Sequence, residues 1–428
     1  MRLKNGLASL LLIAGISLVV GSPGLAANWP RFRGPNGDGI AADKDIPVKW
    51  DEKSGLLWKI GIPGQGNSSP IVWGKRLFVQ SANPDSGERS LICVDTTNGK
   101  ILWTRSAKGA KAAIHPKNSF ASSTPATDGK LVYALFWDGR EIEMRAYDLE
   151  GNEVWQHDLG PFTSGGKTSH SQHGAGASPI VVDDRVILNN DNDKFAALVA
   201  LDAKTGKPGW KADRPSFRTC YSTPFVLERP GAPKELIVAS TAGITSYNPK
   251  DGEANWNYSW SFDGMPLRTV ASPIYSHGLI FINGGDGSGD RHLIAVKAEG
   301  KGDVTKTNLV WENKKAFPYV PTLLALGDHL FYVTDNGFAG CCVATTGEMV
   351  WQKRLGGAFS SSPIIIDGKI YAVTEAGEVY VYEAKPTFKL LAKNSLGEAA
   401  SATPAVADNR LFIRGQDHLF CIGKAEGK

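Results

Sequence analysis

Cysteine is scarce in this sequence: the 428 residues include five, an odd number at irregular spacings. A set this small excludes the disulfide framework that holds many small secreted domains together. No C-x-x-C-H motif for haem attachment is present either. A hydrophobic core must therefore hold the fold. The chain is long enough for about two or three ordinary domains, or for one large all-β domain.

An excess of charge is also missing. Lys and Arg total 47 against 43 Asp and Glu, which gives a formal net charge of only +4. No run of basic residues resembles a nucleic-acid-binding arm or a polybasic membrane patch. We therefore expect no nucleic-acid partner.

Long apolar runs are absent from the rest of the chain after the N-terminus. No later segment approaches the roughly 18 apolar residues of a membrane helix. At the N-terminus, two basic residues precede an apolar stretch from Leu7 to Val20, and small residues follow. This pattern predicts a signal peptide over residues 1–27, cleaved after Ala26 or Ala27 with no cysteine next to receive a lipid. We expect a soluble, monomeric mature chain without a transmembrane segment, exported to the periplasm or the cell exterior.

Helix-period segments and hydrolase motifs are missing too. The chain has no G-x-S-x-G elbow and no H-E-x-x-H zinc motif. Glycine, by contrast, is abundant: 48 residues of 428 exceed the average usage of about 7% and indicate many turns.

A step of Ser or Thr next to proline recurs along the chain. Each copy opens a strand-like segment, as in "SSPIV" and "ASPIVV", and the copies lie 41 to 55 residues apart. A fixed period of this length indicates a repeat architecture. The eight anchors are Pro70, Pro125, Pro179, Pro224, Pro273, Pro321, Pro363 and Pro404.

Further short strands follow each anchored strand. One resembles "KRLFVQS", the next resembles "SLICVDT", and a "TG-x-x-x-W"-like hairpin opens the last. Short period-two strands at even spacing predict a closed all-β array. We interpret the recurring tryptophan as a blade-to-blade contact and expect Leu391 to take its place in the seventh repeat. The tryptophans are Trp103, Trp155, Trp210, Trp256, Trp311 and Trp351.

The eighth repeat ends after three strands, at "HLFCIGK". A donor for the missing strand lies near the N-terminus, in the segment "GLLWKIGI" around Trp58. Lending that strand to the last sheet would close the ring and remove its exposed edges. We predict one all-β domain over residues 56–428, an eight-bladed β-propeller of four-stranded antiparallel blades, after an N-terminal extension over residues 28–55.

The repeat resembles the pyrroloquinoline-quinone-type (PQQ-like) propeller repeat over nearly the whole mature chain. The opening "NWPRFRGPNGDG" resembles the leader of exported bacterial propellers in that group. The same repeat occurs in quinoprotein alcohol dehydrogenases and in the propeller lipoprotein of the outer-membrane barrel-assembly machinery. The resemblance implies the fold and leaves the function open, because the repeat marks blade packing.

One face of such a propeller should carry the loops between blades and the loops between the second and third strands. These loops vary most in length and are polar, which favours function on this face. Residues with positive and aromatic character converge there, and we expect a ring that binds an anionic or sugar-like ligand or an acidic peptide. The candidates at the central mouth are Asn67, Asn118, His170, His173, Arg218, Arg268, Tyr319, Phe359 and Glu398.

Two acidic stretches offer oxygen ligands that would suit calcium. They are "NNDNDKF" from Asn189 to Phe195 and "GGDGSGDRH" from Gly284 to His292. Neither has the glycine and distal glutamate of an EF-hand loop, and Asn and Asp also favour tight turns. We interpret both as turns and predict no metal site.

Three functions remain open. We favour a noncatalytic binding or scaffold propeller of the bacterial envelope that docks a protein, peptide or glycan and needs no cofactor. The resemblance also implies a PQQ-dependent dehydrogenase for an alcohol or sugar. That enzyme would need calcium and a carboxylate base, and Glu398 is the inner-strand carboxylate available. The third is a polysaccharide lyase that uses His170 or His173 with Arg218 or Arg268 beside a uronate carboxylate.

The adjacent Cys341 and Cys342 deserve a separate prediction, because a vicinal disulfide lies against the cofactor in some propeller quinoproteins. Counting back from the turn aligns Cys342 with Cys93 and Cys421, in a slot that holds alanine in other repeats. Cysteine fills such a slot as a small buried hydrophobe. Since neighbouring strand residues point to opposite faces, we predict packing and no disulfide.

Overall fold

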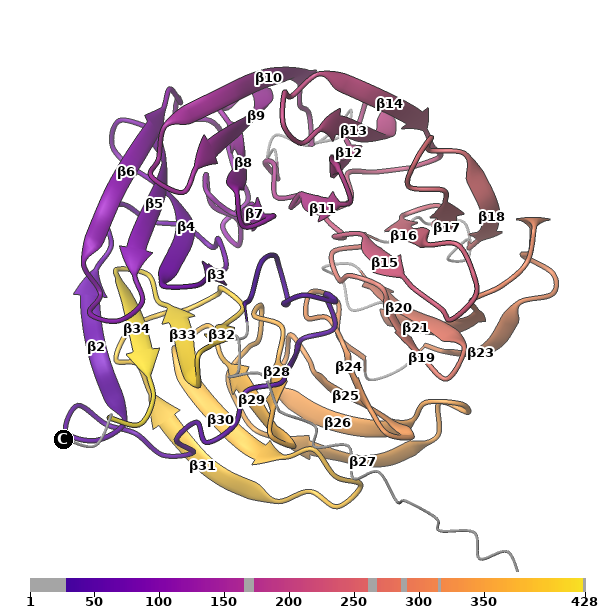
Figure 1. Ribbon diagram of the computed structural model, residues 1–428. Coiled ribbons are helices and arrows are strands. Elements are labelled where there is room, and N and C mark those ends of the chain that lie inside the picture. The colour runs from indigo at the N-terminus through magenta and orange to yellow at the C-terminus, as the bar shows by residue number, and fades with distance from the viewer. Residues whose placement is uncertain (1–27, 165–172, 261–267, 286–290, 315–316, 426–428) are drawn as a thin grey trace, which may run out of the picture.

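The computed structural model describes residues 28–164, 173–260, 268–285, 291–314 and 317–425. These residues form eight sheets around a central axis, with no helix among them (Figure 1). The described part of the chain therefore also lacks any helix long and apolar enough to cross a membrane. The predicted eight-bladed β-propeller is confirmed.

Each blade runs from a short inner strand to a longer outer one. Blades one and two contain β3 (Ile71–Trp73), β4 (Arg76–Ala82), β5 (Arg89–Asp95), β6 (Ile101–Ala107), β7 (Ala126–Thr127), β8 (Leu131–Trp137), β9 (Glu141–Asp148) and β10 (Glu153–Pro161). Blades three and four contain β11 (Ile180–Val182), β12 (Arg185–Asp191), β13 (Ala196–Asp202), β14 (Pro208–Asp213), β15 (Phe225–Leu227), β16 (Glu235–Ser240), β17 (Gly243–Tyr247) and β18 (Ala254–Ser259).

The second half of the ring follows the same plan. Blades five and six contain β19 (Ile274–Ser276), β20 (Leu279–Gly285), β21 (Arg291–Lys297), β23 (Leu309–Asn313), β24 (Leu324–Leu326), β25 (His329–Val333), β26 (Phe338–Val343) and β27 (Met349–Arg354), and β22 (Gly302–Asp303) is added to blade four. Blades seven and eight contain β28 (Ile364–Ile366), β29 (Lys369–Val373), β30 (Glu378–Glu383), β31 (Leu390–Ser395), β32 (Ala405–Ala407), β33 (Arg410–Arg414) and β34 (His418–Ile422), and β1 (Ile40–Ala41) is added to blade seven.

The ring closes as predicted. The N-terminal strand β2 (Leu56–Gly61) pairs antiparallel with β34, so that Trp58 lies opposite Cys421 (Figure 1). The first strand of the propeller thereby becomes the outer strand of the last blade, and β34 is not left with an open edge.

The tryptophans lie between consecutive blades. The Nε1 of Trp155, for example, donates to the carbonyl of Ala203 at 2.9 Å, and its ring packs against Gly206 in the turn of the next blade. Trp256 makes a different contact: its Nε1 donates to Glu235 at 3.0 Å. The connection between β21 and β23 of blade five is longer than the hairpin turns of the other blades, and its strand β22 pairs with β18. The same contact with a carbonyl of the next blade is made by Trp58, Trp103, Trp210, Trp311 and Trp351.

The seventh blade holds alanine in the tryptophan slot. Ala392 pairs with Val381 in the position where Trp103 pairs with Cys93. Leu391 occupies the bulge before it, so the expectation that Leu391 takes the slot is wrong by one residue. The hairpin turn explains the error, because it is one residue longer in blade seven: Glu383 N donates to the carbonyl six residues later, that of Lys389, whereas Asp95 N donates to the carbonyl five residues later, that of Lys100.

The Ser/Thr-Pro steps form a hydrogen-bonded ring around the axis. In all of these steps except that of Thr223, the hydroxyl accepts a backbone N–H from the preceding blade, as in Ser69 N to Thr124 Oγ1 at 3.2 Å. In blade six the ring residue is Thr322, so Leu323, rather than Pro321, stands where the other blades have proline. This hydroxyl ring consists of Ser69, Thr124, Ser178, Thr223, Ser272, Thr322, Ser362 and Thr403.

Residues 28–41 cross the axis below this ring and link blades that are far apart in sequence (Figure 1). Trp29 forms a bridge with Val72 of blade one, and β1 pairs in parallel with β28 of blade seven. The guanidinium of Arg33 is fully buried and donates to the carbonyls of Pro363 at 3.1 Å and Leu323 at 2.7 Å. We call residues 28–41 the axial segment.

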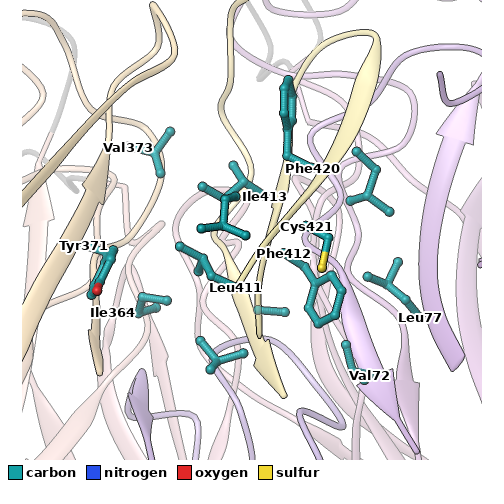
Figure 2. Close-up of a cluster of buried hydrophobic side chains, with 14 of the residues drawn as sticks. Val72, Leu77, Ile364, Tyr371, Val373, Leu411, Phe412, Ile413, Phe420 and Cys421 are labelled. Atoms are coloured by element: carbon teal, nitrogen blue, oxygen red, sulfur yellow. The ribbon is translucent and has the colours of Figure 1, made fainter. Parts of the chain in front are cut away.

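The core lies between neighbouring blades. Figure 2 shows the apolar side chains of blade eight between those of blades seven and one, with Phe412 and Cys421 in the middle. Alternation along β33 and β34 sends successive side chains to the two neighbouring blades, as expected for strands buried on both faces. The blade order therefore follows from many equivalent interfaces.

The cysteine pair is buried and reduced. Cys341 packs with residues of blades six and seven, whereas Cys342 packs with residues of blades five and six. Burial raises the pKa of both thiols to about 12. Cys341 pairs with Trp351 as Cys93 pairs with Trp103, so the slot belongs to Cys341 and the predicted alignment of Cys342 is off by one residue.

Candidate functional site

A cavity of about 610 Å³ opens on the face that carries the inter-blade loops. Its lower wall is the hydroxyl ring, and Phe32 of the axial segment lines its bottom. Because every blade begins its inner strand at this ring, each blade contributes to the wall. The site is therefore axial, at the mouth of the propeller.

An upper ring of side chains follows a fixed place in the repeat. Each of these residues lies two positions before its hydroxyl-ring residue, and alternation along the chain turns both toward the axis. Tyr221 is the largest of them, and its hydroxyl donates to the carbonyl of Gly174 at 3.1 Å. The upper ring consists of Asn67, Ser122, Gly176, Tyr221, Val270, Val320, Ser360 and Ser401.

Six of the nine predicted site residues line this cavity. They are Asn67, Asn118, His173, Arg218, Arg268 and Tyr319. His170 lies outside the described residues.

Phe359 does not reach the cavity. It is fully buried and packs on Tyr380, with ring centroids 6.3 Å apart. It lies one position before Ser360 of the upper ring, so its side chain turns into the space between blades. The expectation that it faces the mouth is wrong.

Glu398 also points elsewhere. Its carboxylate accepts the backbone N–H groups of Asp417 at 3.0 Å and His418 at 2.9 Å, and it pairs with the His418 ring at 2.5 Å. It holds a turn of blade eight and does not line the cavity. The inner-strand carboxylate expected from the sequence is therefore not available at the axis.

Sequence reasoning missed several cavity residues. Tyr221, Ser122 and Ser401 were detectable from their fixed distance to the Ser/Thr-Pro step. Arg291 and Asp335 had no such signal, because they come from β21 and from the turn between β25 and β26.

The cavity is electrically uneven. Among the described residues, its lining holds four cationic side chains, Lys117, Arg218, Arg268 and Arg291, and one carboxylate, Asp335. The three arginines come from blades four and five. Lys117, on the other side, is paired with Glu375 at 2.9 Å.

The Asp335 carboxylate is occupied by groups of the protein. Its two oxygens accept the backbone N–H groups of Tyr319 at 2.7 Å and Val320 at 3.1 Å. The Arg291 Nε lies 3.5 Å away, and the Arg291 guanidinium also lies over the Tyr319 ring, 5.2 Å from its centroid. Asp335 therefore positions Tyr319 and Arg291.

His173 is held uncharged beside these cations. Its ring stacks on His115, with centroids 4.8 Å apart and planes 10° apart, and its Nδ1 lies 3.3 Å from the carbonyl of Ser164. Burial lowers the pKa of His173 to about 4, with further lowering by Arg268, His115 and Arg218. A neutral imidazole leaves the arginines as the cations of the site.

The stretch from Asn189 to Phe195 is only partly the turn that the sequence predicts, because Asn189, Asn190 and Asp191 belong to β12 and the turn comprises residues 192–195. Asn192 accepts the backbone N–H of Lys194 at 2.9 Å, which is the expected turn geometry. Asp191 is fully buried at 3.2 Å from Arg214. The second stretch, Gly284 to His292, falls partly outside the described residues, 286–290 being left out. In the described ranges, no three His, Cys, Asp or Glu side chains are grouped to hold a metal ion.

Fold, repeat and axial cavity together define a PQQ-type β-propeller, which confirms the expected resemblance. A family model described as "Outer membrane protein assembly factor BamB" matches residues 40–190, 140–308 and 304–387. Because these matches span most of the sequence, the chain belongs to that family.

The relatives differ in function, as two of them show. The outer membrane protein assembly factor BamB of Shewanella oneidensis is 20% identical over 291 residues, covering 65% of this chain and 69% of that protein. The quinohemoprotein alcohol dehydrogenase ADH-IIG of Pseudomonas putida is 27% identical over 298 residues, covering 61% of this chain but 38% of that protein.

Solved structures agree on the fold. The crystal structure of BamB from Moraxella catarrhalis has a TM-score of 0.60 at 14% identity, covering 87% of this chain and 98% of that one. The quinohemoprotein alcohol dehydrogenase from Comamonas testosteroni has a TM-score of 0.52 at 14% identity, covering 94% of this chain and 82% of that one.

The cavity residues do not fit a quinone with its calcium ion. Calcium takes six to eight oxygen ligands, several of them carboxylates. Asp335, the one carboxylate that lines the cavity in the described ranges, already accepts two backbone N–H groups and is approached by Arg291. Cys341 and Cys342 are buried between blades, on opposite sides of blade six. Of the cavity residues, only the arginines would suit a part of the cofactor, namely the carboxylates of the quinone.

Proposed function

We propose that this protein is a noncatalytic binding propeller of the bacterial envelope. It engages an envelope protein, peptide or glycan through the loop face around the axial cavity. The observation that carries the proposal is the composition of that cavity. Its walls are rich in cations and hydroxyls, and the one carboxylate that the described residues place there is held by the protein itself. Such a surface is better suited to binding anionic and hydroxylated groups than to catalysing an oxidation.

The relatives support an envelope protein as the partner. The family description names an outer membrane protein assembly factor, and the match spans 69% of the Shewanella protein. We infer that the partner belongs to the apparatus that assembles outer membrane proteins. The proposal requires export, which the signal predicted over residues 1–27 would provide.

Phe217 offers a contact on the loop face. It lies between β14 and β15 and is 63% exposed, the most exposed large hydrophobic side chain of the described residues. Its backbone is fixed, because Phe217 N donates to Thr241 Oγ1 at 2.8 Å. An exposed aromatic ring on a fixed loop is a typical interface anchor.

The test is photo-crosslinking in cells with a photoreactive amino acid at position 217. We expect a discrete adduct with an outer membrane assembly protein. The matched control carries the same amino acid at position 390, because Leu390 is 45% exposed on the outer strand β31. Adducts of equal yield and identity at both positions, or none at 217, would contradict docking on the loop face.

A dehydrogenase is the second candidate, because a relative 27% identical to this chain is a quinohemoprotein alcohol dehydrogenase. Purified protein would be mixed with pyrroloquinoline quinone and calcium and assayed for a bound quinone spectrum and dye-coupled alcohol oxidation. We expect no turnover. Stoichiometric binding with turnover would replace the scaffold proposal by the enzyme.

A further inference from the structure

Arg268 carries a buried charge that the described part of the chain does not neutralise. The residue lines the axial cavity and is 7% exposed, and its Nη1 has no hydrogen-bond partner among the described residues. A buried cation without a partner is costly, so its presence in a cavity wall indicates a ligand-binding role.

The backbone keeps Arg268 in this place. Its N–H donates to the carbonyl of Gly285 at 2.8 Å, and the Gly285 N–H donates back at 3.1 Å. This bridge fixes the Cα at the end of β20. The fixed backbone of Arg268 therefore keeps its side chain at the cavity wall.

The neighbours of Arg268 add positive charge. Arg218 and Arg291 line the same side of the cavity, and Tyr221 and Tyr319 present aromatic rings and hydroxyls next to them. The Asp335 carboxylate on this side is held by two backbone N–H groups. This cationic side attracts an oxyanion, and arginine matches carboxylate and phosphate geometry well.

The opposite side of the cavity is polar and close to neutral. Asn67, Ser360 and Ser401 supply amide and hydroxyl groups, and Lys117 is compensated by Glu375. Such groups exchange hydrogen bonds with the hydroxyls of a ligand. The two sides together would orient a molecule that is acidic at one end and hydroxylated along its body.

We propose that the axial cavity binds a small hydroxylated organic anion, an acidic sugar or a sugar phosphate, with its oxyanion on Arg268 and its hydroxyls toward Asn67, Ser360 and Ser401. The volume of about 610 Å³ lies within the range of roughly 300–1,000 Å³ typical of small-molecule sites. The ligand occupies the axial cavity and leaves Phe217 on the surrounding loops free for a protein. The proposal therefore goes beyond partner docking and is tested separately from it.

The experiment is titration calorimetry on the purified full chain with four probes: galacturonate, glucose 6-phosphate, glucose and inorganic phosphate. We expect binding of one or both sugar anions, which distinguishes a carboxylate from a phosphate ligand. We expect at least tenfold weaker binding of glucose and of inorganic phosphate. Equal binding of glucose, or no binding of either sugar anion at millimolar concentration, would overturn the proposal.

Arg268→Gln should weaken binding of the sugar anion at least tenfold. The matched control is Arg140→Gln, an exposed arginine in the turn between β8 and β9 on the same face, and it should bind as the wild type does. Unchanged affinity in Arg268→Gln would refute the role of Arg268. Tighter binding of a tetra-aspartate peptide than of both sugar anions would assign the cavity to an acidic peptide instead.

Thermal melting separates loss of the ligand from loss of the fold. Without ligand, Arg268→Gln should melt no lower than the wild type, because the substitution removes a buried charge that no described residue pairs with. Saturating sugar anion should raise the melting temperature of the wild type and leave that of Arg268→Gln unchanged. Arg218→Gln, at a partly exposed position, is a second variant and should weaken binding at least threefold.

Discussion

At the scale of single residues, the charge of the axial site depends on His173. Its neighbours are the His115 ring, the guanidinium groups of Arg268 and Arg218, and the carbonyl of Ser164. Burial and the two guanidinium groups, together with His115, lower the pKa of His173 more than the Ser164 carbonyl raises it. The imidazole is therefore neutral at physiological pH.

This environment predicts a pH-dependent stability. The folded pKa of His173, about 4, lies below the unfolded value of roughly 6.5. Between these values the unfolded chain binds the proton and the folded chain does not, so stability falls as the pH drops through this window. His173→Asn should reduce the difference in unfolding free energy between pH 7 and pH 5 by about 1 kcal/mol, after allowance for partial exposure.

Urea unfolding at the two pH values measures this effect. The control is His157→Asn, on the outer strand β10, which should keep the pH dependence of the wild type. If His173→Asn shows the same difference in unfolding free energy between pH 7 and pH 5 as the wild type, another group is responsible for the loss of stability in acid.

At the scale of the element, the repeated hairpin turn is a receptor for the tryptophan of the preceding blade. Gly206 has φ +69°, and a Cβ there would lie 2.5 Å from Cε3 of Trp155. The glycine is therefore required twice, for its backbone conformation and for the close approach of the indole.

The two requirements can be separated by a pair of substitutions. Gly231 has a similar φ of +74° but open space around its Cβ. Gly231→Ala should lower the unfolding free energy by about 1 kcal/mol, the cost of the left-handed conformation. Gly206→Ala should lower it by about 3 kcal/mol, because a steric clash is added. Equal losses in urea titrations would mean that the indole contact contributes little.

At the scale of the whole molecule, the axial segment holds opposite blades together. Trp29 contacts blade one, Arg31 donates to Pro224 of blade four at 3.0 Å, and Arg33 donates to carbonyls in blades six and seven. These contacts supplement the closure of the ring by β2. The propeller is thus fixed at its rim and under its axis.

Removing the Arg33 guanidinium should destabilise the whole propeller. Arg33→Met leaves the carbonyls of Leu323 and Pro363 without their buried donor, and we expect a loss of about 3 kcal/mol. Calorimetric melting should show one transition at lower temperature. Lys49→Met, at an exposed position shortly after the axial segment, is the control and should change stability by less than about 0.5 kcal/mol. A wild-type melting temperature in Arg33→Met would contradict this role.

The number of blades, the order of strands and the closure by the strand around Trp58 could all be predicted from the sequence. These features depend on local signals, namely the Ser/Thr-Pro step, the glycine turn and the tryptophan, that recur at a fixed period. The signal peptide over residues 1–27 and the domain limits at 28–55 and 56–428 remain predictions from the sequence.

The side chains that reach the axis could be identified only in the folded chain. A shift of one residue turns a side chain to the opposite face, so Ser360 lines the cavity and Phe359 is buried. A turn that is one residue longer puts Ala392 rather than Leu391 in the tryptophan slot. Arg291 and Asp335 join the site from different blades, and no local pattern encodes that meeting. Periodicity fixes the propeller, whereas the register of each strand and the convergence of distant loops fix the site.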